Sequence, residues 1–298
     1  MRVGITILPE YRWRDAEPKW RAAETYGFDH AWTFDHLGWR SLVDGPWFGA
    51  VPTLTMAAAV TSRIELGPLV SSPNYRHPVS FARELTALDD ISAGRFTLGV
   101  GAGGTGSGSG DLSYDLRVFG HTAAPRRRAS RFAEFVELLD ALLTTDGLDW
   151  SGEHYTAVGA RNNPGCVQQP RIPFVVAANG PKAMRVAARF GQGWITTGEP
   201  QEDLEGWWAS VATAAARFDE ALAAEQRPRG EVRRFLQSDA APVYSLSSVA
   251  RYREFLDRAA ELGFTDVVAP WPRAEGVYAG SEAVLEQVAT EVLPGLSR

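Results

Sequence analysis

The sequence has a single cysteine, Cys166, and only two lysines, Lys19 and Lys182, among its 30 basic residues. One cysteine cannot form a disulfide within the chain or a thiolate metal cluster, so nothing points to an oxidising compartment. We interpret Cys166, in the segment NNPGC, as a loop thiol and not as a nucleophile. The scarcity of lysine also argues against a lysine-based phosphate-binding loop.

The sequence has no excess of positive charge. Its 30 basic and 36 acidic residues give a net charge of −6, which offers no electrostatic footprint for nucleic acid or an anionic membrane. The first apolar run stops at Pro9 and Glu10, too early for a signal peptide, and no later run approaches the length of a membrane span. We therefore predict a cytoplasmic protein that acts on a small molecule.

The residue patterns of two large classes of hydrolase are missing as well. No His-x-His pair or His/Asp set has the spacing of metal ligands, so no metal site is predicted. No G-x-S-x-G segment is present, which leaves covalent acyl transfer without a candidate nucleophile.

Short apolar runs rich in β-branched residues alternate with segments of helical spacing. Strands are predicted at 3–8, 30–34, 64–70, 96–100, 174–178, 193–196, 233–241 and 265–269. Helices are predicted at 15–26, 52–61, 79–92, 126–144, 181–190, 201–224, 248–262 and 281–292, with a small hairpin at 150–158.

The order of these elements predicts the fold class. Eight strand–helix units follow one another in 298 residues, and no linker or low-complexity segment divides them. This favours an α/β fold of the (β/α)8 TIM-barrel type over a doubly wound open sheet. We expect a single domain over 1–298, with an insertion after the fourth strand.

In such a barrel the chemistry lies at the carboxyl ends of the strands. Asp35 and His36 end the second strand, where they serve either as capping and packing residues or as an acid–base couple. Three tryptophans, Trp39, Trp47 and Trp271, lie in loops or at a strand end, and we treat them as candidate walls of a substrate pocket.

The segment GVGAGGTGSGSGD follows the fourth strand and contains G-x-G-x-x-G. A dinucleotide site requires these glycines to open a helix, whereas here they continue into a glycine-rich loop. We therefore interpret Gly101, Ala102 and Gly103 as a place where the backbone approaches a flat ligand, with a lid-forming loop beyond it.

The segment 178–181, Ala-Asn-Gly-Pro, joins the fifth strand to a helix. It is either a tight turn capped by Asn179 or an anion site built from backbone N–H groups. Because Thr196 and Thr197 end the neighbouring strand, their hydroxyls would complete a phosphate site without any lysine, and we predict one here. The four arginines in 126–131 are interpreted as solvated.

Five segments together resemble the bacterial luciferase-like superfamily of flavin- and deazaflavin-dependent oxidoreductases. They are GFDHAWTFDH at 27–36, TSRIELGPLVSSPNYRHP at 61–78, LTALDDISAGRFTLGVGAG at 85–103, YDLRVFG at 114–120 and FVVAANGPKAMRVAARFGQGWITTG at 174–198. The resemblance implies a barrel whose cofactor ring lies across the strand ends, with its phosphate held after the fifth strand and near the sixth. It also implies a homodimer.

Similarity to members that use the deazaflavin coenzyme F420 assigns roles to individual residues. Asp35 and His36 would face the reactive edge of the ring, and Leu69-Val70, followed by Ser71, would form a bulge with a non-proline cis peptide bond. The other implied cofactor contacts are Gly101, Ala102 and Gly103 at the ring, and Ala178, Asn179, Gly180, Thr196 and Thr197 at the phosphate. The sugar-phosphate dehydrogenases of the group carry glutamate where this sequence has Gly104, so their substrate is not expected here.

Three functions follow as hypotheses. The first is hydride transfer between coenzyme F420 and a small organic substrate, with His36 as the proton donor or acceptor. The second is an FMN-dependent monooxygenase, and the third is a flavin-binding barrel without catalysis. The arginine-heavy composition is typical of actinobacteria, where the deazaflavin is common, and favours the first. The substrate would be set by the loops 37–50, 104–125 and 270–280.

Overall fold

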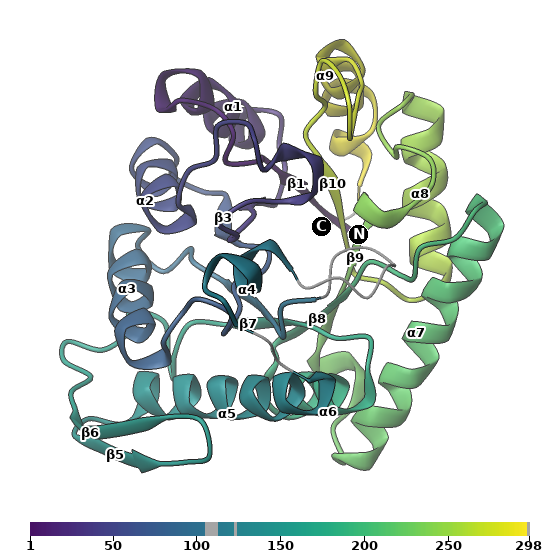
Figure 1. Cartoon of the computed structure of the whole chain (residues 1–298). Helices are drawn as coiled ribbons and strands as arrows, with labels where there is room; N and C mark the ends of the chain where they lie inside the picture. The colour runs from purple at the N-terminus through teal and green to yellow at the C-terminus, as the bar shows by residue number, and fades with distance from the viewer. Residues whose placement is uncertain (105–112, 122–123, 297–298) are drawn as a thin grey trace.

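A computed structural model describes residues 1–104, 113–121 and 124–296. Eight parallel strands form a nearly closed barrel (Figure 1). In chain order these strands are β1 (Arg2–Thr6), β2 (His30–Thr33), β3 (Glu65–Pro68), β4 (Leu98–Gly101), β7 (Phe174–Ala177), β8 (Gly193–Thr196), β9 (Arg233–Gln237) and β10 (Asp266–Pro270). The ladder runs β3-β2-β1-β10-β9-β8-β7-β4, and two parallel bridges, Leu66–Phe96 and Ser71–Val100, connect β3 to β4. The predicted TIM barrel is confirmed.

Helices surround the barrel and connect its strands (Figure 1). They are α1 (Trp13–Thr25), α2 (Ala50–Val60), α3 (Pro78–Ile91), α5 (Pro125–Thr144), α6 (Pro181–Phe190), α7 (Leu204–Ala224), α8 (Val249–Glu261) and α9 (Glu282–Glu291). Proline opens α3, α5 and α6, where its missing N–H costs nothing, and the side chains of Asp203, Ser248 and Ser281 cap α7, α8 and α9. No helix in the described part of the chain is both long and apolar enough to cross a membrane.

The predicted insertion after the fourth strand is present between β4 and β7. It contains the short helix α4 (Tyr114–Val118), which the sequence patterns do not predict, then α5 and an antiparallel hairpin of β5 (Leu148–Ser151) and β6 (Thr156–Ala160). The Glu134 carboxylate on α5 accepts the backbone N–H groups of His154 and Tyr155 at 2.8 and 2.9 Å. The hairpin is thereby fixed to the outside of the barrel.

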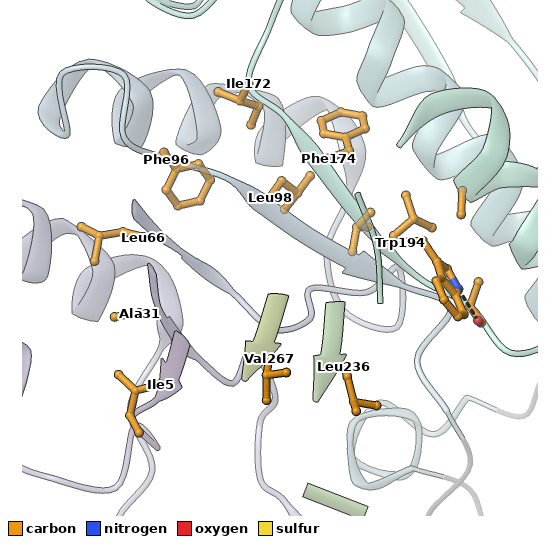
Figure 2. Packing of buried hydrophobic residues seen from close by; sticks show 14 of the residues in the cluster. Ile5, Ala31, Leu66, Phe96, Leu98, Ile172, Phe174, Trp194, Leu236 and Val267 are labelled. Carbon is orange, nitrogen blue, oxygen red and sulfur yellow. Dashed lines mark hydrogen bonds between the residues drawn. The ribbon is translucent and has the colours of Figure 1, made fainter. Parts of the chain in front are cut away.

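The hydrophobic core has two layers, because successive side chains of a strand point to opposite faces. The outer layer lies between strands and helices, and Figure 2 shows residues of it such as Phe174 and Trp194. The inner layer fills the barrel and consists of Trp32, Leu69, Val175, Ile195, Phe235 and Val268, with Val70 and Ala177 packed against it.

A charged network occupies the amino ends of the strands. The buried Asp266 carboxylate accepts hydrogen bonds from His30 at 3.0 Å and from Arg233 at 2.5 and 3.2 Å, and Arg233 also contacts Glu65. Trp32 donates its indole N–H to Nδ1 of His30, so the proton of this imidazole is on Nε2, facing Asp266. Burial opposes ionisation of Asp266, but the bonds from His30 and Arg233 hold its pKa well below the usual range.

Candidate active site

A cavity of about 660 Å³ lies at the carboxyl ends of the strands. Its floor is the top of the inner core layer, with Leu69, Val70 and Ile195 exposed to it, and the starts of α5 and α6 form one side. The predicted site residues that line it are His36, Trp39, Leu69, Val70, Gly101, Ala102, Gly103, Ala178, Asn179, Gly180, Thr196 and Thr197. The backbone segments singled out in the sequence therefore meet around one cavity.

Two predicted features of the backbone are present at this cavity. The Leu69–Val70 peptide bond is cis, as predicted. Gly103 has φ +67°, and a Cβ there would lie 2.1 Å from Nδ2 of Asn74, so glycine is required by both conformation and space. Gly101 and Gly103 thus bring the backbone to the cavity, as the sequence indicates, and the lid-forming loop predicted beyond them falls mainly on 105–112, outside the described residues.

His36 is held in the cavity wall by an aspartate that the sequence analysis does not single out. Its Nδ1 lies 2.7 Å from the carboxylate of Asp115, whose other oxygen accepts the backbone N–H of Leu37 at 2.7 Å. A buried carboxylate only accepts hydrogen bonds, so Nδ1 of His36 is the donor and Nε2 is left for a ligand. The pair can hold and release a proton at Nε2.

The structure does not place Asp35 and Ser71 at the cavity as predicted. Asp35 is buried, and its carboxylate accepts hydrogen bonds from Ser71, Tyr75 and the Nε and Nη2 groups of Arg76. Burial and the adjacent Asp35 carboxylate raise the pKa of Tyr75. Asp35 therefore fixes the loop after β3, which carries Leu69 and Val70, and has no free lone pair to act as a base.

Of the three predicted pocket tryptophans, Trp39 lines the cavity and the other two do not. Trp47 packs behind it and donates its indole N–H to the His36 carbonyl at 2.7 Å. Trp271 is buried between α1 and α9, where it stacks on Tyr26 and donates to Glu282 at 2.9 Å. Trp271 is a packing residue, because its surface is covered by protein, and the half-buried Trp47 uses its indole N–H within the loop after β2.

The side chains available as donors at the predicted anion site are not the two threonines expected from the sequence. The hydroxyl of Thr196 donates to Oδ1 of Asn179 at 2.7 Å, and that of Thr197 donates to the Gly198 carbonyl at 3.1 Å, so neither is a free donor. Instead, Lys182 and Arg126 line this end of the cavity. No side chain caps α6, which leaves the N–H groups of its first turn available. Lys182 and Arg126 thus lie beside the predicted backbone amides, whereas the two hydroxyls form hydrogen bonds within the protein.

The arginine segment is solvated in part, since Arg126 and Arg127 are exposed whereas Arg128 and Arg131 are half-buried. Arg126 lines the cavity, and Arg128 donates to the Gly103 carbonyl at 3.4 Å. Arg131 donates to Oδ1 of Asn74 at 2.8 Å. These side chains support the wall around Gly103 as well as carrying positive charge toward the cavity.

A second acid, Asp239, follows β9 and lines the cavity. Burial raises its pKa to about 6, although the positive charge of Arg40 and a 3.4 Å hydrogen bond from Tyr278 favour ionisation. Its Oδ1 is buried without a hydrogen-bond partner in the described structure. Asp239 therefore differs from Asp35 and Asp115, whose oxygens are satisfied.

The model of the family described as luciferase-like monooxygenase matches residues 1–238. The chain belongs to this family. The resemblance inferred from its sequence motifs is thereby confirmed.

Similar luciferase-like proteins differ in their named activities. The F420-dependent glucose-6-phosphate dehydrogenase of Beutenbergia cavernae is 34% identical over 207 residues, which cover 67% of this chain and 58% of that protein. The 4-hydroxyprotoasukamycin monooxygenase of Streptomyces nodosus subsp. asukaensis is 31% identical over 219 residues, covering 68% and 54%. The chain thus spans little more than half the length of these relatives.

Among solved structures, the coenzyme F420-dependent tetrahydromethanopterin reductase from Methanopyrus kandleri superimposes with a TM-score of 0.79. The alignment covers 99% of both chains at 19% identity, which supports the shared barrel fold.

Three candidate functional residues of this luciferase-like chain are not assigned from sequence. Asp115 lies in 114–120, one of the five segments that carry the family resemblance, but the neighbouring sequence does not predict its contact with His36. Lys182 follows the predicted anion loop, and Asp239 lies near the end of the predicted strand 233–241, so position alone marks both of them as candidates.

Proposed function

We propose that this protein is an oxidoreductase that binds the deazaflavin coenzyme F420 and transfers a hydride between it and a small organic substrate. The observation that carries the proposal is the His36–Asp115 pair in the wall of an apolar-floored cavity whose other end is cationic. The names of relatives and of a solved structure that depend on coenzyme F420 support the same cofactor.

The residues of the cavity fit such a cofactor. Leu69, Val70 and Ile195 would face a flat aromatic ring with apolar surface, and Gly101 would let the ring approach the backbone. Lys182, Arg126 and the first-turn amides of α6 would hold a phosphate. The coenzyme, when bound, would supply the hydride chemistry.

The chain itself would manage the proton that accompanies the hydride. Neutral His36 would accept a proton at Nε2 from a substrate hydroxyl in the oxidative direction, and protonated His36 would return it to a carbonyl oxygen in the reductive direction. Asp115 would keep the proton of Nδ1 in place and stabilise the imidazolium form. The aromatic ring of Phe34, 6.3 Å from that of His36, would help to exclude water.

The alternative is a monooxygenase that uses FMN, which the name of the Streptomyces relative supports. Parallel titration of the purified protein with the deazaflavin and with FMN would separate the two by their dissociation constants. Tighter binding of FMN by tenfold or more, about 1.4 kcal/mol, would favour the alternative. Cofactor binding without turnover on any substrate of a broad panel would favour the non-catalytic barrel.

Gly180 offers a test of the anion site. It lines the cavity at the start of α6, with φ −94°, and a Cβ added there would have nothing within 4 Å. Gly180→Leu should weaken coenzyme binding more than tenfold, because its side chain would cover the amides that hold the phosphate. Gly180→Ala, which adds one methyl group in open space, is the matched control and should bind nearly as well as the parent. Equal affinities of the leucine variant and the parent in a fluorescence titration would exclude a phosphate at this turn.

We also propose that the chain is one domain over 1–298, works in the cytoplasm and forms a homodimer. Helix α2 has no charged residue, and Met56 on its outer side is 41% exposed, which suits a self-complementary contact. Light scattering at micromolar concentration should give twice the chain mass, and Met56→Glu should lower it to the monomer value. A monomeric parent would contradict the dimer.

A further inference from the structure

The cavity has two electrostatically different ends. Lys182 and Arg126 lie at the end formed by α5 and α6, whereas Asp239 is the one acidic side chain among the described residues that line the cavity. A cavity divided in this way can orient a bound pair of molecules by charge, with an anion at one end and a hydrogen-bond donor at the other.

Asp239 belongs to the same end as His36, because a chain of aromatic contacts connects them. Tyr278 donates its hydroxyl to Oδ2 of Asp239 at 3.4 Å, and its ring stacks on Trp39 with centroids 5.9 Å apart. Phe34 contacts both Trp39 and His36, at centroid distances of 5.0 and 6.3 Å. Asp239 and the proton-carrying imidazole therefore face one space above the apolar floor.

The hydrogen bonding of Asp239 is incomplete in a way that a structural role does not explain. Oδ1 has no hydrogen-bond partner and Oδ2 has one long bond from a side chain, with weaker support from the backbone N–H groups of Asp239 and Ala240, whereas the buried Asp35 accepts bonds from three side chains. Arg40, whose charge favours ionisation of Asp239, lies over the Trp39 ring at 4.2 Å. Burial of an unpaired carboxylate is unfavourable, and a ligand that donates a hydrogen bond would relieve that cost.

We propose that Asp239 recognises the substrate by accepting a hydrogen bond from a donor group next to the reacting carbon. The substrate class is then a small alcohol or carbonyl compound that also carries an amino or hydroxyl group, with a protonated amine binding best. Carboxylates and phosphates at that position are disfavoured, because they would meet the carboxylate of Asp239. The reacting carbon named in this inference rests on the proposed function. The selectivity among substrates comes from the Asp239 carboxylate itself.

Three probes of nearly equal size test the charge preference: 1-amino-2-propanol, 2-butanol and lactate, which are cationic, neutral and anionic at about pH 7.5. Their dissociation constants would be measured by ligand-observed NMR on the parent, with and without coenzyme. We expect the amino alcohol to bind about tenfold more tightly than 2-butanol, and lactate most weakly. Asp239→Asn should remove most of that tenfold preference while leaving 2-butanol within about twofold.

Asp44→Asn is the matched control, since it removes one negative charge from an exposed position outside the cavity lining. It should keep the preference of the parent, because an exposed charge is screened by solvent. The melting temperature of Asp239→Asn should be no lower than that of the parent, because the substitution removes a carboxylate whose charged form is disfavoured by burial. Such a melting temperature would show that the variant is folded.

Equal binding of the three probes by the parent, or an unchanged preference in Asp239→Asn, would overturn the inference. So would an equal loss of affinity for all three probes in that variant, which would indicate a structural role. Titration of the parent with the deazaflavin tests the proposed function separately. If the coenzyme does not bind but the parent still prefers the amino alcohol, the proposed function is wrong and the recognition of the amine by Asp239 is retained.

Discussion

His36→Ala is expected to lower the rate of the chemical step by roughly 10²–10⁴ while changing coenzyme affinity only a few-fold. The large loss follows from removing the group that would hold the transferred proton, with its Nε2 in the cavity wall and Nδ1 bound to Asp115. Affinity should be nearly unchanged, because the proposed phosphate contacts lie at α6. The measurement is single-turnover oxidation of reduced coenzyme without oxygen, alongside a binding titration.

The variant Asp115→Asn, measured in the same assay, separates the positioning of His36 by Asp115 from the proton transfer by His36 itself. Asparagine can still accept the Leu37 N–H but no longer stabilises an imidazolium, so the rate should fall less than in His36→Ala and its pH profile should shift. Thermal unfolding of both variants checks the fold. Parent-like single-turnover rates in His36→Ala would end the assignment of proton transfer to this residue.

Asp266→Ala is expected to lower the free energy of unfolding by about 3–5 kcal/mol, since it removes the acceptor of the buried His30 and leaves the half-buried Arg233 with Glu65 alone. For a chain of this length the melting temperature should fall by about 5–8 °C. The matched control is Glu205→Gln, which breaks the exposed pair with Arg258 and should change stability little.

The loss in Asp266→Ala should also depend on pH. The pKa of Asp266 is lower in the folded chain than in the unfolded one, so its stabilising contribution is present above about pH 4 and is lost as the pH falls below that value. Urea unfolding should therefore show a constant difference from the parent between about pH 4 and 8, and a smaller difference as the pH falls below about 4. A variant as stable as the parent at neutral pH would mean that the network contributes no net stability.

The barrel could be predicted from sequence because each strand and helix is marked locally. Apolar runs give the strands, and glycine or proline ends most of them, so the bounds agree to within a few residues. The predicted strand 233–241 is longer than β9 because the chain turns at Ser238 into a short 3₁₀ helix, which apolar pattern does not signal.

The site could be predicted only where the backbone itself forms it. Gly101, Gly103 and Gly180 lie at the cavity because strand ends meet at one edge of the barrel. The partner of His36 could not be predicted, since Asp115 is 79 residues away and lies on a helix of five residues that has no periodic pattern. The sequence leaves two roles open for Asp35, and its place could not be predicted, because adjacent side chains after a strand point in different directions and the one beside His36 faces the loop after β3.

The pairing of β1 with β10 has a consequence for how the chain is made. Arg2 to Thr6 pair in register with Asp266 to Pro270, so the barrel closes only when its last strand is available. At about 5–20 residues per second, β10 leaves the ribosome roughly 15–50 s after β1. During that interval one edge of β1 and the apolar inner layer lack their partners, and such an edge invites pairing with other chains. The unpaired edge of β1 can therefore be covered by its own chain only after residue 270 has emerged.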